Sequence, residues 1–463
     1  MRLRRILIAN RGEIAVRVLR TCQQLGIQTV LAASEADLDS TAARLADRTV
    51  VLGPAPPAAS YLDVAAVVRA ARAAGADALH PGYGFLAESP ALARACAGAG
   101  IVFIGPTADQ LAALGDKLRA RALASAAGVP VVPGGEVSGA EEAGRVAARI
   151  GWPVLVKAVG GGGGRGMLLV GSPDDLPAAV DRAAAEAQAA FGDSRLYLER
   201  YVTSGRHVEV QLLGDGRRVA HLGDRDCSVQ RRYQKLVEEA PAPGLEPQLR
   251  ERIHHAAVTL GASLGYRGVG TVEFLVDPRR GEWYFLELNA RIQVEHPVTE
   301  EVYGVDLVAE QIAVAEGRPL RLAQADLAPS GHAVEFRINA EDPAAGFRPS
   351  PGTVTGAWFP AGAGIRVDTH LQAGTAVPPF YDSLLAKLVV RGRDRAQALA
   401  RSRAALAASD IQGVATNLAL HTRLVEDPRF VAGGVDTGFL ARMLSPDRDH
   451  ALPTPSPPGG GDG

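Results

Sequence analysis

Polar and apolar residues alternate strictly over one short stretch near the middle of the chain. The polar positions are Glu287, Asn289, Arg291, Gln293 and Glu295, and the positions between them are Leu288, Ala290, Ile292 and Val294. Tyr284 and Leu286 continue the apolar face upstream. Alternation of this kind predicts an extended strand with one face on the core. A half-exposed edge strand is the simpler interpretation, but solvated strand faces favour Thr, Lys and Ser rather than carboxylates, amides and a guanidinium.

The length of this row limits what it can hold. At ~3.3 Å per residue it would span roughly 26 Å, which is too long for a single metal site. One end could bind a divalent metal through oxygen ligands, and the other end could bind a small anion. The row is therefore the first place where we expect the chemistry.

Composition excludes several classes of function. With 463 residues and ~150 residues per domain, the chain has room for two to four domains. Its net charge of -2 gives no electrostatic reason to bind nucleic acid or an anionic membrane. No stretch approaches the ~18 apolar residues of a membrane span. We expect neither a nucleic-acid partner nor a membrane partner.

Two further features favour a cytoplasmic protein. Cys22, Cys96 and Cys227 are too few and too scattered for a disulfide framework, and no CxxC pair exists to bind zinc. The N-terminal apolar run stops at Asn10-Arg11, which is too short for a signal peptide and predicts a first strand instead.

The first hundred residues predict a doubly wound α/β domain. Helical runs end at Gly26, Gly75 and Gly100, where glycine can adopt the left-handed conformation that stops a helix. Helices and strands that alternate imply parallel pairing. The GxGxxG of a dinucleotide-binding fold does not follow the first strand. The predicted strands are 6–9, 27–33, 76–79 and 101–104.

A second unit begins after the turn-rich residues 128–135. It is predicted to contain a helix (139–150), a strand (153–159), a glycine loop, a strand (167–170), an Ala-rich helix and a strand (196–199), and to form a small mobile subdomain. A β-rich region follows to about residue 330. From Gly331 a third domain is predicted, with strands 332–338 and 384–390 and a helix at 394–408. The tail from Ser445 has the composition of a disordered segment.

The glycine loop follows Lys157, which ends an apolar strand. Six of the seven positions from 160 to 166 are glycine, and Arg165 is the exception. Successive backbone N–H groups in such a loop can bind an anion. A flexible hinge is the simpler interpretation, but it would need neither the lysine nor the arginine. The pattern favours a loop that covers phosphates, with Lys157 as a point charge.

Two more segments carry charged residues. A hairpin over 270–287 brings Glu273 and Glu287 together, and two adjacent carboxylates suit Mg²⁺ unless both face solvent. Residues 225–235 hold four basic side chains in a segment that looks like a loop, for which a solvated charge run is an equally good interpretation.

Taken together, these segments resemble biotin carboxylase, the ATP-grasp component of biotin-dependent acetyl-CoA or acyl-CoA carboxylases. The resemblance covers residues 3 to about 444. It is carried by the ordered motifs Ile8-Ala-Asn-Arg-Gly-Glu-Ile14, His80-Pro-Gly-Tyr-Gly-Phe85, the Lys157 loop, Arg225–Lys235, Val237-Glu-Glu-Ala-Pro241, Glu287–Glu300 and His332–Asp342.

The resemblance implies a mixed α/β and α+β fold. An N-terminal α/β domain (1–113) would precede an ATP-grasp domain (114–330) with a mobile lid at about 131–203. A β-rich α+β C-terminal domain (331–446) and a disordered tail (447–463) would follow. It also implies the reaction, in which bicarbonate attacks the γ-phosphate of MgATP. The resulting carboxyphosphate carboxylates a protein-linked biotin.

Roles are carried over by position. The implied ATP-binding residues are Lys117, Lys157, Gly162, Gly163, Gly164, Gly166, Glu199, His207 and Gln230. The implied ligands of Mg²⁺ or Mn²⁺ are Glu273, Glu287 and Asn289. Bicarbonate would be bound by Lys235, Arg291, Gln293 and the Val294 backbone, with Glu295 as general base. Tyr83 and Arg337 would bind biotin, and Arg337 would stabilise its enolate. Lys235, Arg291, Glu295 and Arg337 form the implied catalytic set.

The resemblance leaves three points open. Tyr233 stands where the family more often has His, which obscures the role of this position. The only methionines are Met1, Met167 and Met443, so the chain has no Met-Lys-Met site for biotin. We therefore expect the biotin carrier protein and the carboxyltransferase on separate chains, and family likeness favours a homodimer. The final acceptor stays open.

Two other functions compete with this interpretation. Another ATP-grasp ligase, joining a carboxylate to an amine, would share the lysines and metal carboxylates but would have no reason for Arg291–Glu295 and Arg337. A non-catalytic nucleotide-binding regulator would be indicated by loss of a metal ligand or base. None of Glu273, Glu287, Glu295 and Arg337 is missing.

Overall fold

The computed structural model describes residues 2–159 and 167–444 of the chain. Its N-terminal part contains a five-stranded parallel sheet. The strand order is β3-β2-β1-β4-β5. From β1 the chain adds β2 and β3 on one side and then β4 and β5 on the other, as expected for a doubly wound layer. Gly26, Gly75 and Gly100 have φ of 68°, 62° and 70°, which confirms the predicted helix stops. The elements are β1 (Arg5–Ile8), α1 (Gly12–Gln24), β2 (Gln28–Ser34), α2 (Thr41–Leu45), β3 (Arg48–Gly53), α3 (Val64–Ala73), β4 (Ala78–His80), α4 (Pro90–Gly98), β5 (Val102–Phe103) and α5 (Ala108–Leu114).

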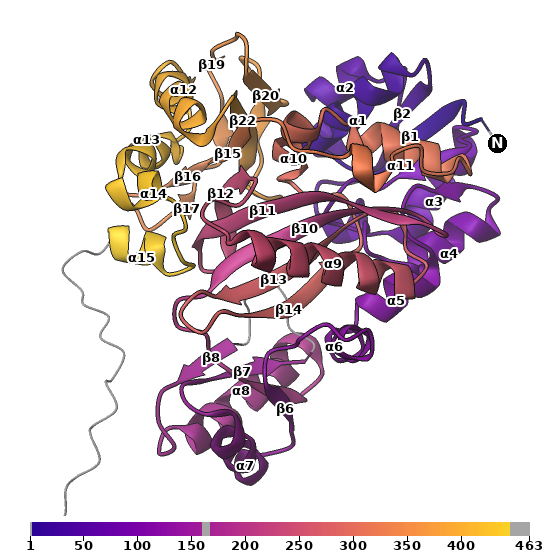
Figure 1. Ribbon diagram of the computed structural model, residues 1–463. Coiled ribbons are helices and arrows are strands. Elements are labelled where there is room, and N and C mark those ends of the chain that lie inside the picture. Colours follow the sequence, from indigo (N-terminus) through magenta and orange to yellow (C-terminus); the bar gives the residue numbers. More distant parts are fainter. Residues whose placement is uncertain (1, 160–166, 445–463) are drawn as a thin grey trace, which may run out of the picture.

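The lid is a separate small layer that hangs below the rest of the molecule (Figure 1). Its four strands form an antiparallel sheet in the order β6-β9-β7-β8, and its two helices bury their apolar sides on a core of its own. The predicted helices and strands of this unit are all present, and the predicted glycine loop lies outside the described residues. They are β6 (Gly134–Val137), α7 (Ala140–Ile150), β7 (Val154–Ala158), β8 (Met167–Val170), α8 (Leu176–Phe191) and β9 (Leu196–Arg200), and α6 (Lys117–Ala126) precedes them.

An eight-stranded sheet forms the centre of the molecule. Its order is β14-β13-β10-β11-β12-β15-β22-β20, so strands from the predicted ATP-grasp region and the predicted C-terminal region share one sheet. Helix α9 packs on one face (Figure 1). The elements are β10 (Arg206–Asp215), β11 (Val219–Arg231), β12 (Gln234–Ala240), α9 (Pro247–Ser263), β13 (Arg267–Asp277), β14 (Glu282–Asn289), α10 (His296–Tyr303) and α11 (Leu307–Ala315).

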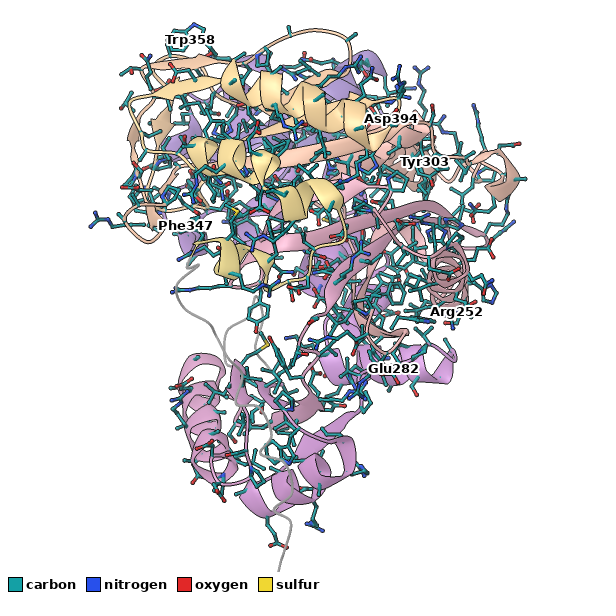
Figure 2. The ribbon with its side chains drawn as sticks, turned by 60° about the vertical axis from the view of Figure 1, so that its left-hand side comes forward. Arg252, Glu282, Tyr303, Phe347, Trp358 and Asp394 are labelled. Atoms are coloured by element: carbon teal, nitrogen blue, oxygen red, sulfur yellow. The ribbon has the colours of Figure 1, made fainter. Side chains whose placement is uncertain are left out.

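The C-terminal part adds strands and a cluster of helices to the same sheet. The predicted strands and helix of this part are present as β15, β22 and α12. The elements are β15 (His332–Asn339), β16 (Glu341–Asp342), β17 (Arg348–Pro349), β18 (Gly352–Thr353), β19 (Gly356–Trp358), β20 (Ile365–Thr369), β21 (Ala376–Val377), β22 (Leu384–Gly392), α12 (Arg395–Ala407), β23 (Asp410–Gln412), α13 (Leu418–Glu426), α14 (Pro428–Ala432) and α15 (Phe439–Leu444). Trp358 lies at the end of this part that is farthest from the lid (Figure 2).

The prediction of one strand over Glu287–Glu295 is only half right. The strand β14 ends at Asn289, residues 290–295 turn, and α10 begins at His296. Pro297 favours this helix start, because its ring fits the first turn of a helix. A bulge in the pairing of β13 with β14 also places Phe285, rather than Leu286, in the core. Leu286 lines the cavity instead.

The prediction of a loop over residues 225–235 is wrong for most of its length. Residues up to Arg231 belong to β11, and β12 begins at Gln234, so only Arg232 and Tyr233 form the turn. Their φ values are 48° and 68°, an uncommon left-handed conformation for side chains of this size. Within the described residues, no helix is both long and apolar enough to cross a membrane.

Candidate active site

One cavity of about 650 Å³ lies between the lid and the central sheet. Its walls include Tyr83, Lys117, Lys157, Glu199, His207, Gln230, Lys235, Glu273, Glu287, Asn289, Arg291, Gln293, Val294, Glu295 and Arg337. These are all the described residues that the sequence predicted for the site. Gly162, Gly163, Gly164 and Gly166 lie outside the described residues. The predicted residues are therefore gathered from segments far apart in the chain around one space.

Lys235 is the charged centre of the cavity wall. Its Nζ lies 2.6 Å from Glu209 Oε2, 2.8 Å from Glu273 Oε1 and 2.7 Å from Glu295 Oε1. The three carboxylates come from β10, β13 and the N-terminus of α10. Burial alone would lower the pKa of Lys235, but the three carboxylates raise it well above its ordinary value. The lysine is therefore a permanent cation.

Glu295 is held between Lys235 and Arg337. It occupies the position just before α10 but makes no capping hydrogen bond, so its carboxylate is free to receive other donors. Nη2 of Arg337 donates to its Oε2 at 2.8 Å. Burial raises the pKa of Glu295, but Lys235, Arg337 and Arg225 outweigh burial and hold this pKa below its ordinary value. The side chain is 2% exposed and ionised.

Arg225 lies beneath the cavity wall and is completely buried. It is ion-paired with Glu209 at 2.5 Å and donates to Gln293 Oε1 at 2.9 Å. Gln211 Oε1 at 2.7 Å, Thr299 Oγ1 at 2.9 Å and Thr271 Oγ1 at 3.1 Å accept hydrogen bonds from its remaining N–H groups. A buried guanidinium with this many acceptors fixes the groups around it, because each would otherwise be left unpaired. The solvated charge run considered for this segment is excluded at Arg225.

The predicted metal ligands meet where β13 and β14 pair. Glu273 stands directly opposite Glu287 in the register, as the hairpin predicted. Nδ2 of Asn289 donates to Glu273 Oε1 at 3.0 Å and to Glu287 Oε1 at 3.2 Å. Lys235 and His207 hold the pKa of Glu273 well below its ordinary value, although burial raises it. Glu273 is therefore ionised, as an oxygen ligand of a metal ion would need to be.

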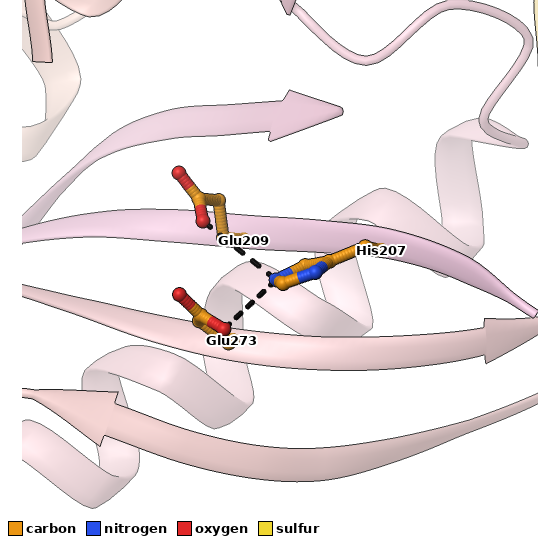
Figure 3. Close-up of side chains that lie close together, drawn as sticks. All are labelled: His207, Glu209 and Glu273. Atoms are coloured by element: carbon orange, nitrogen blue, oxygen red, sulfur yellow. Dashed lines mark ion pairs between the residues drawn. The ribbon is translucent and has the colours of Figure 1, made fainter. Parts of the chain in front are cut away.

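His207 lies beside one carboxylate of its own strand, Glu209, and one of the neighbouring strand, Glu273. Its Nε2 is 2.9 Å from Glu273 Oε2 and 3.8 Å from Glu209 Oε2 (Figure 3). Burial lowers the pKa of His207, but Glu273 raises it above its ordinary value. These three side chains could hold a metal. Both oxygens of Glu209 already contact Lys235 or Arg225, so the cations of the chain neutralise this cluster without an ion.

The turn after β14 is tied to the N-terminal domain. Nε of Arg291 pairs with Glu88 Oε2 at 3.0 Å, and the Ala290 N–H donates to Glu88 Oε1 at 3.0 Å. Arg291 Nη2 also donates to Asn289 Oδ1 at 2.8 Å. The Val294 carbonyl accepts from Lys387 Nζ at 3.0 Å. These contacts hold the turn, and its side chains, in one position.

Tyr83 enters the site from the N-terminal domain. Its hydroxyl donates to Glu13, and Lys387 Nζ lies 3.1 Å from the other oxygen of Glu13. Tyr83 and Arg337 line the same cavity although they are more than two hundred residues apart in sequence. The predicted pair of biotin-binding residues is therefore present at one end of the space.

The lid contributes the other end of the cavity. Lys157 of β7 is ion-paired with Glu199 of β9. Nearby, Arg121 donates to the Tyr197 hydroxyl at 2.7 Å. Asp116 caps α6 and thereby places Lys117 at the first position of this helix, facing the same space. Gln230 is buried, and Tyr233 is 53% exposed at the turn between β11 and β12.

Polar contacts link the lid to the edge of the body, and Arg200 makes two of them. Arg200 Nη2 donates to Glu282 Oε2 at 2.9 Å, and the same guanidinium contacts Tyr284. Glu282 lies on the side of the body next to the lid (Figure 2). Val132 and Val202 also pack against Tyr284 of the body, so the junction combines polar contacts with a small apolar cluster.

Sequence reasoning missed several residues of this site. They are Glu13, Glu88, Glu209, Arg225, Glu238, Glu335 and Lys387. A signal was present for one group, since His207, Glu209 and Gln211 alternate with apolar residues in the same manner as the row in β14. Glu13, Glu88 and Lys387 have no such signal, because they reach the site only through the packing of separate domains.

Three family models match consecutive parts of the chain. They are "Biotin carboxylase, N-terminal domain" at residues 2–111, "Carbamoyl-phosphate synthase L chain, ATP binding domain" at 116–323 and "Biotin carboxylase C-terminal domain" at 335–442. The biotin carboxylase of Nostoc sp. is 48% identical over 96% of this chain and 100% of that protein. A pyruvate carboxylase subunit of Methanothermobacter thermautotrophicus is also 48% identical, over 94% of this chain and 89% of that protein.

Solved structures agree with the sequence matches. Biotin carboxylase from Campylobacter jejuni, described as a complex with ATP, is 44% identical with a TM-score of 0.92 over 95% of this chain and 99% of that chain. The biotin carboxylase domain dimer of Hydrogenobacter thermophilus 2-oxoglutarate carboxylase, in complex with MgADP, ADP and bicarbonate, has 44% identity and a TM-score of 0.91 over 96% of this chain and 98% of that chain. With the N-terminal, ATP-grasp and C-terminal parts all matched, the chain belongs to the biotin carboxylase family.

Proposed function

We propose that this chain carboxylates carrier-linked biotin with bicarbonate and ATP through carboxyphosphate, the first half-reaction of a biotin-dependent carboxylase. The observation that carries the proposal is the arrangement of Lys235, Glu295 and Arg337. A permanent cation and a guanidinium each lie within 2.8 Å of one ionised carboxylate on one cavity wall, opposite the lid. That set suits a small anion that must be both held and deprotonated.

Bicarbonate would be bound by Lys235, Arg291, Gln293 and the Val294 backbone, and Glu295 would take its proton. Before bicarbonate binds, Glu295 is a weak base, because Lys235 and Arg337 stabilise its ionised form. A bicarbonate that shares these donors removes part of that stabilisation. The pKa of Glu295 then rises, and its ability to accept the proton increases.

Biotin would be bound at the end of the cavity formed by Tyr83 and Arg337. The oxyanion that forms on biotin needs a fixed positive charge in a site poor in water. Arg337 supplies this charge without losing a proton, since the neighbouring carboxylates raise its pKa further. Its side chain is 16% exposed, so one edge of the guanidinium still faces the cavity.

The nucleotide would lie between the lid and β13–β14. We assign phosphate contacts to Lys117, Lys157 and the glycine loop, and the adenine to the hinge that follows Glu199. His207 and Gln230 would contact the nucleotide from the body. The Lys157–Glu199 ion pair must rearrange when adenine and phosphates arrive, because both partners then gain other contacts. The lid would close over the nucleotide and exclude water.

Glu273, Glu287 and Asn289 fit the magnesium ion that ATP chemistry requires. Two carboxylates and an amide oxygen are hard oxygen ligands of the kind that Mg²⁺ prefers, and the amide of Asn289 would have to turn its Oδ1 from Arg291 toward the ion. Glu273 and Glu287 already face each other across the hairpin, so a divalent cation would relieve their repulsion. When bound, the ion would neutralise charge on the transferred phosphoryl group. Mn²⁺ could replace it at the same ligands.

The biotin carrier and the carboxyltransferase would be separate chains, and the protein would act as a homodimer in the cytoplasm. The match covers 100% of the Nostoc biotin carboxylase but 41% of the Rhizobium etli pyruvate carboxylase chain. Cys22, Cys96 and Cys227 are all free and buried, which suits a reducing compartment. Acetyl-CoA, and with it fatty acid biosynthesis, is one candidate acceptor among several.

The test is the dependence of ATP turnover on bicarbonate. The purified chain, supplied with Mg²⁺ and either free biotin or a biotinylated carrier, should cleave ATP only when bicarbonate is present. Omitting biotin should reduce the rate, and a carboxylate–amine pair should not replace bicarbonate. Equal ATP turnover in bicarbonate-depleted buffer would contradict the proposal.

A further inference from the structure

Two carboxyl groups lie behind Arg337 and have no role in the reaction described above. Glu238 of β12 and Glu335 of β15 are direct partners in the antiparallel register. Both side chains are completely buried. Side chains at paired positions point to the same face of a sheet and have Cβ atoms roughly 5 Å apart. Two acids therefore stand side by side in the interior of the protein.

Neither acid has a hydrogen-bond donor among the described residues. Arg337 Nε lies 2.6 Å from Glu238 Oε1, although its N–H does not point along a hydrogen-bond direction. The same guanidinium donates to Glu295 through Nη2 at 2.8 Å. Glu238 and Glu295 consequently compete for one positive charge. A buried carboxylate without a donor is costly unless it is protonated.

The other charges around the pair are already engaged. Lys387 of β22 stands opposite Arg337, but its Nζ lies 3.1 Å from Glu13 and 3.8 Å from Asp368. Lys235 of β12 contacts three other carboxylates. Cys227 of β11, the remaining titratable neighbour, is a buried thiol. Within the described chain, the acids next to Glu238 and Glu335 outnumber the cations that could neutralise them.

The titration of the two acids agrees with this geometry. Burial raises the pKa of Glu238 to about 7 against the opposing charge of Arg337. Burial raises the pKa of Glu335 well above its ordinary value against the opposing charge of Lys387, and the nearby charge of Glu238 adds to the rise. Glu335 therefore holds a proton more strongly than an ordinary carboxyl group does, while Glu238 gains or loses its proton close to neutrality.

We propose that Glu238 and Glu335 form a protonation switch on Arg337. On the acidic side both acids are neutral, and the full charge of Arg337 is available to the oxyanion that forms on biotin. On the alkaline side Glu238 is ionised, accepts a hydrogen bond from Glu335, and takes part of that charge. Glu238 is thus a positioning residue that acts through Arg337. The inference about biotin rests on the proposed function, but the protonation itself does not.

The first experiment needs no activity. Infrared difference spectra of the purified chain between pH 6 and pH 8 should show loss of a protonated carboxyl band, because few other acids titrate in this range. The band should be absent from Glu238→Gln. It should persist in Glu310→Gln, a matched control on α11 that is half-buried and lies outside the cavity. If the wild-type spectrum lacks this band, the proposed switch is wrong, whatever the spectra of the two variants show.

The second experiment measures the ratio of biotin carboxylation to ATP cleavage as a function of pH. In the wild type this ratio should decline by up to about tenfold per pH unit once Glu238 ionises. In Glu238→Gln the ratio should stay flat. In Glu335→Leu, which removes the hydrogen-bond donor to ionised Glu238, the decline should move to higher pH. A merely structural role would lower the ratio by the same factor at every pH, and that result would contradict the proposal.

The two experiments separate the possible failures. A band that titrates in a chain without bicarbonate-dependent ATP turnover supports the buried acid pair and rejects the proposed function. Turnover that depends on bicarbonate, without the band, rejects the acid pair alone.

Discussion

The two ends of the cavity differ in the burial and connectivity of their ion pairs. At the end formed by the central sheet, Lys235, Glu295 and Arg337 belong to a buried network of ion pairs that is complete without substrate. At the lid end, the Lys157–Glu199 pair is partly exposed and joins two strands of a small, separate layer. The central-sheet end is supported by eight strands that pack on two large hydrophobic cores. The lid end is supported by four strands that pack on one small core.

The difference reflects what each end must do. Proton removal from bicarbonate and charge stabilisation on biotin require groups held in place before the substrate arrives. A nucleotide must enter and leave in every cycle, so its binding surface must open. A buried network of many ion pairs is expensive to disturb, whereas a single ion pair with one partly exposed partner costs less to break. The following predictions test this contrast, from the largest expected effect to the smallest.

Removal of one lysine from each end should have very different consequences. Lys235→Met leaves three carboxylates without their cation, and we expect a loss of about 3–5 kcal/mol in the free energy of unfolding together with loss of activity. Lys157→Met is the matched variant in the lid. It should raise the KM for ATP but change the free energy of unfolding by only about 0–1 kcal/mol. Chemical denaturation measures both, and equal destabilisation would abolish the contrast.

Two substitutions should divide the chemistry within the buried end. Glu295→Gln should reduce bicarbonate-dependent ATP cleavage by about 10²–10³, because no other ionised group takes its place. Arg337→Ala should reduce carboxylation of biotin by a similar factor and affect ATP cleavage less. Some effect on ATP cleavage is expected, since Arg337 also contacts Glu295 at 2.8 Å. If both rates fell equally in Arg337→Ala, the separate role on biotin would be refuted.

Hydrogen exchange should distinguish the two ends in the wild-type chain. MgATP should slow exchange in residues 131–203, the lid, by closing it over the nucleotide. Strands β10 and β13 should already be protected and should change little, because both are interior strands of the central sheet. Mass spectrometry of peptic fragments gives both values in one sample. Unchanged lid exchange in the presence of bound ATP would refute lid closure.

The last prediction concerns pH and stability. The pKa of Glu238 is raised in the folded state from 4.5 to about 7, so the folded chain binds more protons than the unfolded chain between these values. The wild type should therefore lose stability relative to Glu238→Gln as pH rises from about 4.5 through about 7, and the difference should then level off. Thermal unfolding over this pH range measures it. A stability difference that grows in the opposite direction would mean that Glu238 is ionised throughout.

Much of the site was predictable from residue order. The hairpin that pairs Glu273 with Glu287 follows from two runs of β-forming residues around a turn, and the register confirms it. The helices and strands of the lid were predicted because their hydrophobic periods are clear and glycine or proline marks their ends. Local signals of this kind act over a few residues, and they do not depend on how the rest of the chain packs.

Other features could not be predicted in this way. The turn over 290–295 has the alternation of a strand, but Glu88 of another domain binds its backbone and Arg291. Residues 225–231 look solvated by composition, yet Arg225 is completely buried because neighbouring strands and α10 supply its acceptors. Partners of this kind lie tens to hundreds of residues away, so no local pattern records them.

The sequence by itself determined the family, the order of the elements, and the residues that gather around the cavity. Ordered motifs carry that information because each one keeps its chemistry in its own short segment. Only the tertiary structure decided which charges share a partner. Lys235 joins carboxylates from three separate segments, and Glu238 meets Glu335 behind Arg337, because sheet register and burial set these distances. Electrostatic energy depends on distance and desolvation, and the order of residues along the chain specifies neither quantity directly.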